Sequence, residues 1–127
     1  MSNTDRFRAY IAAYARKDLA AIDAMLAPEV SLRDWNLSVQ GKVATLSETA
    51  KNFAAAATID IDILALYSSE DAVAGELKIV VDRREELRVV DVITFNAQGA
   101  VVSIRAYLGR AEVARPPRAA IDAERSH

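Results

Sequence analysis

Residues 89–109 read VVDVITFNAQGAVVSIRAYLG, and they carry the clearest structural signal in the chain. Every second residue up to Phe95 shares one face of an expected strand: Leu87, Val89, Asp91, Ile93 and Phe95. This period of two is typical of a β-strand with one buried face. Residues 96–99 follow as a turn, in which Gly99 can adopt the positive φ that such turns often need. Residues 101–108 then return as a last strand, so the segment predicts an antiparallel hairpin.

The same period of two extends upstream of this hairpin. Ile59, Ile61 and Ile63 alternate with acidic residues, which predicts a strand with one face in water. A further strand is predicted over residues 73–81, and the polar residues 82–84 connect it to the strand that carries Asp91. Residues 59–108 therefore predict a four-stranded antiparallel meander.

The N-terminal half follows a helical period instead. Thr4 or Asp5 can cap a first helix, Asp18 can cap a short second helix, and Gly41 breaks the chain before a third. The expected apolar face of the first helix is Phe7, Tyr10, Ile11 and Tyr14, and that of the second is Leu19, Ile22 and Leu26. The third helix should have Leu46, Ala50, Phe53 and Ala54 as its inner face. Residues 30–39 are interpreted as an irregular strand pair or as a strand and turn. The expected fold class is α+β, with three N-terminal helices packed on a curved, mainly antiparallel sheet.

The length of 127 residues suits one domain with a single core. We expect this domain to span residues 1–110 and to be followed by a charged, proline-containing tail at residues 111–127. Pro116 and Pro117 cannot donate the hydrogen bonds of a central strand. We therefore expect the tail after about Arg115 to be dispensable for folding.

Composition excludes several classes of function. The net charge of −2 gives no basic surface of the kind that binds nucleic acid or an anionic membrane. There is no cysteine, and the single histidine, His127, is the last residue, so cysteine and histidine catalysis and metal sites built on these ligands are not expected. No secretory signal or run of about 18 apolar residues is present. We expect a cytoplasmic protein that uses neither a metal nor an organic cofactor.

Asp91 is the least expected residue on a strand face that should point into the core. A carboxylate there loses hydration and should prefer to be protonated, unless a cation or several donors reach it. A neutral carboxylic acid in an apolar site can donate a hydrogen bond to an oxygen on which negative charge develops. The alternative is structural, with Asp91 capping a neighbouring backbone group or pairing with Arg105.

Further polar and aromatic residues are candidates for a pocket. Asp34 falls on the inward face of its expected strand, although it could instead begin a turn. Tyr10 lies on the inner face of the first helix, where a tyrosine usually packs in the core with its hydroxyl satisfied at the edge. Tyr14 lies one turn later and competes with Tyr10 for any role. Trp35 and Tyr107 are interpreted as pocket walls or as contacts between subunits.

Two segments resemble the ketosteroid isomerases of the nuclear-transport-factor-2-like (SnoaL-like) superfamily. Residues 10–35, YIAAYARKDLAAIDAMLAPEVSLRDW, look like that family's opening helices and first strand, and residues 89–109 resemble its final hairpin. The resemblance covers about residues 5–110 in order of elements and implies a cone-shaped pocket. It assigns Asp34 as the general base, which moves a proton between two carbons of an enone. It assigns Tyr10 and a protonated Asp91 as hydrogen-bond donors to the enolate oxygen.

The sequence also departs from the family's pattern. The connection between Asp34 and Gly41 is shorter, and Leu26 and Thr49 stand where the family has tyrosines that support its oxyanion-hole tyrosine. Leu108 stands where the family has an aromatic residue near the pocket. The residues expected to line the substrate pocket are Tyr14, Trp35, Phe53 and Leu108.

The leading hypothesis is a cofactor-free isomerase that moves a proton next to a carbonyl on an apolar cyclic, steroid-like substrate. The alternatives are a non-catalytic small-molecule binding domain and a related acid–base enzyme, such as an epoxide hydrolase or a polyketide cyclase. Epoxide-opening relatives use an Asp-Arg-Asp group around a water molecule, for which Arg105 would supply the cation. We expect a small apolar partner rather than nucleic acid or membrane. We also expect a homodimer through the outer sheet face, whose apolar residues are Val80, Val90, Val92 and Ile104.

Overall fold

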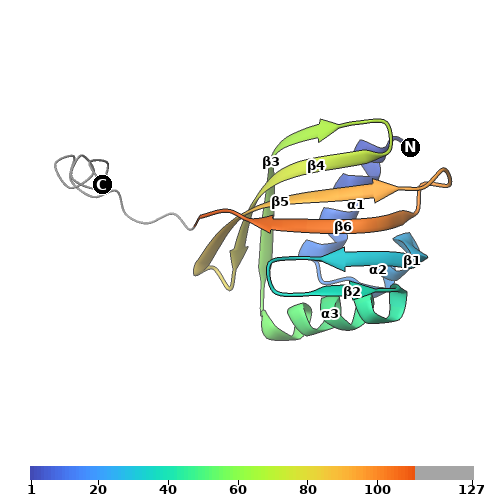
Figure 1. The fold of residues 1–127 in the computed structure, drawn as a ribbon. Coiled ribbons are helices and arrows are strands. Elements are labelled where there is room, and N and C mark those ends of the chain that lie inside the picture. Colours follow the sequence, from blue (N-terminus) through green and yellow to red (C-terminus); the bar gives the residue numbers. More distant parts are fainter. Residues whose placement is uncertain (111–127) are drawn as a thin grey trace, which may run out of the picture.

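The computed structural model describes residues 1–110, and the expected tail at residues 111–127 lies outside the described residues. Its elements (Figure 1) are, in chain order, α1 (Asn3–Ala15), α2 (Leu19–Met25), β1 (Leu26–Arg33), β2 (Ser38–Gln40), α3 (Lys42–Ala55), β3 (Ile59–Ser68), β4 (Ala72–Val81), β5 (Glu85–Phe95) and β6 (Val101–Leu108). This order confirms the α+β class with three N-terminal helices. The segment expected to be irregular is the hairpin of β1 and β2.

The six described strands form one sheet in the order β2-β1-β6-β5-β4-β3. Neighbouring strands are antiparallel except β1 and β6, which are parallel, so the sheet is mainly antiparallel as expected. In Figure 1, α1 and α2 lie behind the sheet and α3 runs along its β2 edge. Contacts join α1 to β3 and β4, and α3 to β1 and β2. Register shifts within three strand pairs add bends to the sheet, which curves around the helices.

Each helix begins at a capping residue that local sequence can predict, and one of these caps differs from the expected residue. The N-cap of α1 is Ser2 rather than Thr4 or Asp5. The Ser2 hydroxyl accepts a hydrogen bond from the backbone N–H of Asp5, and the Asp5 carboxylate accepts one from the N–H of Ser2. This reciprocal capping box explains why Asp5 lies in the first turn instead of preceding it. Asp18 caps α2 and Gly41 precedes α3 with φ of 92°, both as expected.

Two helix faces also differ from the expected pattern. α2 ends at Met25, and Leu26 is the first residue of β1, since Pro28 shortly afterwards cannot continue a helix. In α3, Ala54 is exposed rather than part of the inner face. The buried residues of α3 are Thr45, Thr49 and Phe53. The inner face of α3 is therefore more polar than the sequence pattern indicates.

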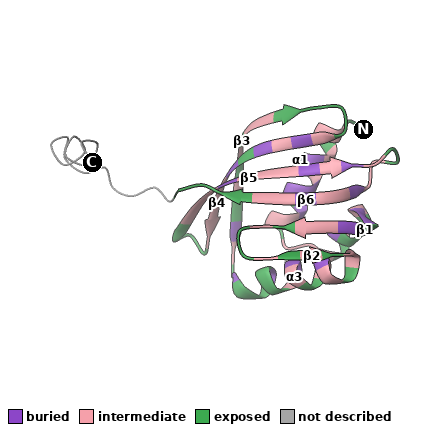
Figure 2. Cartoon of the chain, viewed as in Figure 1, coloured by how far each residue is buried: buried purple, intermediate pink, exposed green. Residues whose placement is uncertain are grey.

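The packed core occupies one half of the space between the helices and the sheet. Phe7 of α1 is fully buried and lies against β4 at Gly75, where an added Cβ would come within 2.4 Å of the Phe7 ring. Val73 and Ile93 on the same halves of β4 and β5 are also fully buried. Figure 2 shows exposed residues at turns, at strand ends and along α3. Towards the other ends of β4 and β5 the inner face is only partly buried, and there it lines a cavity.

Ile104 was expected on the outer sheet face, and that expectation is wrong. It is 3% exposed and pairs with the buried Ile93 on the inner face. Val101 and Ile104 both face inward although they are three residues apart, because the register shift beside Phe95 inserts one extra residue into β6. The outer face keeps Val80, Val90 and Val92, which are partly buried.

Candidate functional site

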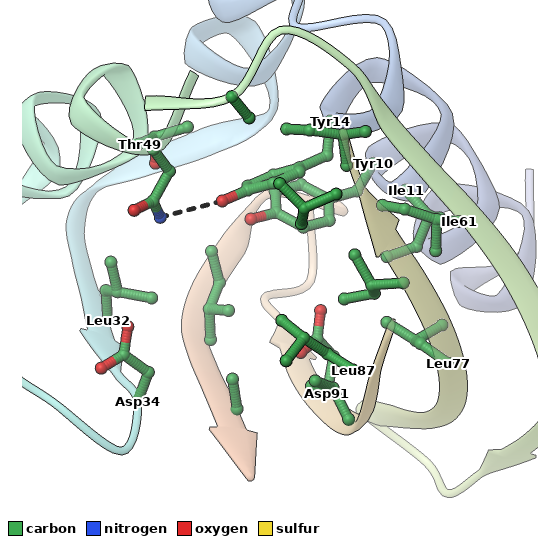
Figure 3. A pocket seen from close by; sticks show the side chains of 18 of the residues that line it. Tyr10, Ile11, Tyr14, Leu32, Asp34, Thr49, Ile61, Leu77, Leu87 and Asp91 are labelled. Atoms are coloured by element: carbon green, nitrogen blue, oxygen red, sulfur yellow. Dashed lines mark hydrogen bonds between the residues drawn. The ribbon is translucent and has the colours of Figure 1, made fainter. Parts of the chain in front are cut away.

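A cavity of about 290 Å³ lies between the uncovered half of the sheet and the helices. Figure 3 shows side chains from α1, the end of β1 and β5 projecting into it. Most of its wall is apolar and comes from Ile11, Leu32, Ala55, Ala56, Ile59, Ile61, Leu77, Ile79, Val81, Leu87, Val89, Ile104 and Ala106. Its polar lining comes from Tyr10, Tyr14, Asp34, Asn36, Thr49, Asn52 and Asp91, with Trp35 at one side. No Lys, Arg or His of the described chain lines it.

Asp91 lies on the inner face of β5, as the alternation predicts, and lines this cavity. Its cross-strand neighbours are Gly75 on β4 and Ala106 on β6. Neither neighbour has a polar side chain, and the Phe7 ring fills the place that a side chain at Gly75 would take. No hydrogen bond or ion pair to Asp91 occurs within residues 1–110. Burial among apolar groups raises the pKa of Asp91 to about 7, so near neutral pH much of it is a neutral carboxylic acid.

The alternative partner for Asp91, Arg105, lies on the other side of the sheet. Arg105 pairs with Val92, the residue after Asp91, and successive strand residues point to opposite faces. Its guanidinium donates to the hydroxyl of Ser103 at 3.3 Å. The expectations that Arg105 could pair with Asp91 or supply the cation of an Asp-Arg-Asp group are therefore wrong, because the register separates the two residues.

Tyr10 and Tyr14 project from successive turns of α1 into the cavity, with ring centroids 6.0 Å apart (Figure 3). Tyr10 is only 4% exposed, and its hydroxyl has no hydrogen-bond partner within the described chain. The Tyr14 hydroxyl accepts a hydrogen bond from the side-chain amide of Asn52 at 3.0 Å. The Tyr14 ring also packs edge-on against Phe53, at 4.9 Å between centroids. Tyr14 is therefore fixed at its ring and at its oxygen, whereas Tyr10 is fixed by packing alone.

Both tyrosines remain protonated at neutral pH. Burial raises the pKa of Tyr10 well above its usual value, and Tyr14 and Asp91 raise it further. Burial also raises the pKa of Tyr14, the Asn52 hydrogen bond lowers it, and the carboxylates of Asp91 and Asp34 raise it. The Tyr14 hydroxyl thus lies within electrostatic reach of both carboxyl groups.

Asp34 begins a turn and also lines the cavity, so both interpretations of this residue hold. Its Oδ1 accepts backbone hydrogen bonds from Asn36 at 2.7 Å and Leu37 at 3.0 Å. Its own N–H donates to the carbonyl of Leu37 at 2.9 Å. Oδ2 accepts no hydrogen bond within residues 1–110. The turn fixes one carboxylate oxygen and leaves the other beside the cavity (Figure 3).

The expected pocket-wall residues fall into two groups. Tyr14 and Trp35 line the cavity, and Trp35 is 45% exposed. Phe53 is buried behind Tyr14, and Leu108 is 44% exposed near the end of β6; neither is among the lining residues. Tyr107 pairs with Val90 on the outer face and is 53% exposed, which favours the contact interpretation over the wall.

Sequence reasoning missed Asn52, which lines the cavity and holds the Tyr14 hydroxyl. The only local signal is its position three residues after Thr49 on the same side of α3. Nothing in that spacing points to Tyr14, which is 38 residues away in the chain.

The described residues contain no group of three or more acidic, histidine or cysteine side chains that could hold a metal ion. Among the helices of residues 1–110, none is long and apolar enough to cross a membrane.

Comparison with known proteins identifies the family. The sequence pattern of the SnoaL-like domain matches residues 7–104. The chain belongs to the SnoaL-like family. No curated protein matches the sequence of this SnoaL-like chain.

Solved structures share the fold of this SnoaL-like chain at low sequence identity. AclR, a candidate hydroxylase from Streptomyces galilaeus, has a TM-score of 0.76 at 15% identity, covering 98% of this chain and 90% of AclR. A candidate ketosteroid isomerase from Kribbella flavida has a TM-score of 0.72 at 16% identity, covering 87% and 80%. An LEH-like epoxide hydrolase from M. tuberculosis has a TM-score of 0.69 at 17% identity, covering 81% and 79%. These similarities show a nuclear-transport-factor-2-like fold, and the solved structures that share it are described with different activities.

Proposed function

We propose that this SnoaL-like protein is a cofactor-free isomerase that moves a proton next to a carbonyl group of an uncharged, apolar, cyclic substrate. The observation that supports it is the convergence of Tyr10, Asp34 and Asp91 on one apolar cavity, where Tyr10 and Asp91 have no partner in the described chain. Buried polar groups are normally hydrogen-bonded, and unpartnered ones in a cavity are typical of a ligand site.

In this proposal the three residues divide the chemistry. Oδ2 of Asp34 takes a proton from the carbon next to the carbonyl, and the electron pair moves onto the carbonyl oxygen. Tyr10 and the neutral Asp91 donate hydrogen bonds to that oxygen while it carries negative charge. Asp34 then returns its proton to another carbon of the conjugated system, which restores the carbonyl and regenerates the base.

The lining residues also favour an uncharged substrate. No cationic side chain of the described residues faces the cavity, so a substrate carboxylate or phosphate would find no charged partner there. The volume of about 290 Å³ lies near the lower end of the range of small-molecule pockets, roughly 300–1,000 Å³. A one- or two-ring portion therefore fits inside, and a longer, steroid-like body would extend past Trp35 at the exposed side.

Isotope exchange tests the proposal without knowledge of the natural substrate. We expect the protein to catalyse exchange of hydrogen for deuterium next to the carbonyl in a panel of small cyclic enones, followed by mass spectrometry in D₂O. Asp34→Asn should abolish the exchange because it removes the base. Tyr10→Phe and Asp91→Ala should each slow it about 10²- to 10³-fold, the usual loss for one oxyanion donor.

Asp60→Asn is the matched control, since Asp60 is an exposed aspartate on β3 that does not line the cavity. Wild-type exchange by Asp34→Asn would show that the base is assigned wrongly. Ligand binding at these residues without exchange of any enone would instead favour the non-catalytic binding domain.

A further inference from the structure

Within residues 1–110, Asn52 is the one polar side chain of α3 that hydrogen-bonds to another side chain lining the cavity. Its side-chain nitrogen donates to the Tyr14 hydroxyl oxygen at 3.0 Å, drawn as the dashed line in Figure 3. An amide NH₂ group can only donate, so the Tyr14 oxygen is the acceptor in this contact. The phenolic proton is not used by Asn52 and is available to another acceptor.

The surroundings of Tyr14 direct that proton towards the cavity. Its ring lies between Tyr10, at 6.0 Å, and Phe53, at 4.9 Å, which restricts rotation of the ring. A phenolic hydrogen stays close to the ring plane, and Asn52 occupies one side of the oxygen. No second hydrogen-bond partner for the Tyr14 hydroxyl occurs in residues 1–110. Because Tyr14 lines the cavity, a ligand bound there is a candidate acceptor for this proton.

We propose that Asn52 is a positioning residue, which holds the Tyr14 hydroxyl so that it donates to the ligand oxygen as a second tyrosine donor beside Tyr10. This inference rests on the proposed function, because it assumes that the ligand oxygen binds where Tyr10 and Asp91 donate to it. It extends that function by adding Tyr14 to the donors and by giving α3 a role in holding it. A hydrogen bond accepted by the Tyr14 oxygen also makes its proton a stronger donor.

The test uses an acidic fluorinated phenol, bound as its phenolate at pH 6 and measured by calorimetry. A phenolate oxygen can only accept hydrogen bonds, so it reports the donors around it. We expect Tyr14→Phe to weaken binding about tenfold or more, and Asn52→Leu to weaken it about five- to tenfold. In the Tyr14→Phe background, Asn52→Leu should have no further effect, whereas in the Tyr10→Phe background its effect should persist. A double-mutant cycle of this kind separates action through Tyr14 from a general structural role.

Asn52→Asp sharpens the test because it reverses the direction of the hydrogen bond. A carboxylate accepts the Tyr14 proton and removes it from the ligand, so binding should weaken beyond the effect of Asn52→Leu. Ala54→Asp and Ala54→Leu are the matched controls, since Ala54 is exposed on the same helix and does not line the cavity. Both controls should bind the phenolate within about twofold of wild type, the scatter usual for surface substitutions.

A ligand-free readout separates the two proposals. The ¹³Cζ resonance of Tyr14, assigned with Tyr14→Phe, should move on Asn52→Leu and stay in place on Ala54→Leu. Phenolate binding that is unaffected by Asn52→Leu, or an equal loss in the Tyr14→Phe background, would overturn the role of Asn52 and leave the proposed function standing. Absence of phenolate binding in every variant would overturn both, even if the resonance still reports the contact.

Discussion

The two cross-strand neighbours of Asp91 help to explain why the pKa of this acidic residue is raised. Gly75 and Ala106 flank Asp91 and offer no side-chain hydrogen bond. The carboxyl group is therefore desolvated without being paired, which raises its pKa to about 7 and leaves it open to the cavity. Asp34 differs because two backbone N–H groups stabilise one of its oxygens. The two aspartates of the cavity thus have different surroundings, because Asp91 is unpaired and one oxygen of Asp34 is held by a turn.

The raised pKa of Asp91 predicts how anion binding depends on pH. A phenolate should bind best below about pH 7, where Asp91 is a neutral donor, and more weakly as pH rises through about 7 and Asp91 becomes a carboxylate. Asp91→Asn should bind more weakly than wild type at pH 6, because an amide is the weaker donor, and should lose this dependence on pH. Asp34→Asn should bind more tightly, because it removes a negative charge from the cavity.

Calorimetry between pH 6 and pH 8 with the three proteins checks these affinities. The phenol must stay ionised throughout that range. Equal affinities in all three would leave both carboxyl groups with a structural role only.

At the scale of elements, the close packing of α1 on β4 determines how much of the sheet stays uncovered. Phe7 fits against β4 because Gly75 has no side chain. Next to this contact the inner faces of β4 and β5 are buried, and further along the same strands they line the cavity. One glycine in a strand therefore fixes the depth at which the helix sits, and with it the position of Tyr10 and Tyr14.

Gly75→Ala should destabilise the fold by about 1–3 kcal/mol, because the new Cβ would come within 2.4 Å of the Phe7 ring. Without this clash the same change should stabilise the chain by about 0.4–1 kcal/mol through loss of glycine's freedom in the unfolded state. Adding Phe7→Leu should recover part of the loss, so the two changes should be non-additive in urea unfolding. A gain in stability from Gly75→Ala alone would show that the contact relaxes freely.

For the whole molecule, the outer face of the sheet is the surface that no described helix covers. It presents Val80, Val90 and Val92 together with the exposed Tyr67 and Tyr107, which are 58% and 53% exposed. Apolar and aromatic groups on one open sheet face are typical of an interface. The homodimer therefore remains a prediction, now without Ile104, which faces the core.

We expect light scattering to give twice the chain mass of 13.8 kDa at micromolar concentration. Val92→Lys should give a mass of one chain while the fold persists, because a charge at the centre of the outer face opposes a symmetric contact. Val43→Lys is the matched control, since Val43 is 85% exposed on α3, and it should leave the dimer intact. A wild-type mass of one chain would contradict the prediction.

Local patterns in the sequence were enough to predict the fold class and most element boundaries. The alternation around Asp91, the cap at Asp18 and the glycine turn at Gly99 depend on residues within a few positions of each other. Helical and strand periods and caps are local properties of the chain, so they can be read without knowledge of the fold. The inward direction of Asp91 also followed from alternation alone.

Tertiary structure decided which residues meet. One extra residue in β6 shifts the alternation between Val101 and Ile104, which moves Ile104 inside, and the same pairing leaves Arg105 behind the sheet. The contact between Asn52 and Tyr14 joins helices that are far apart in the chain. Strand register and helix packing depend on the shape of the whole core, in which a bulge or a missing Cβ changes every later contact. For this reason the sequence identified acidic and aromatic candidates, and only the fold determined that they share one cavity.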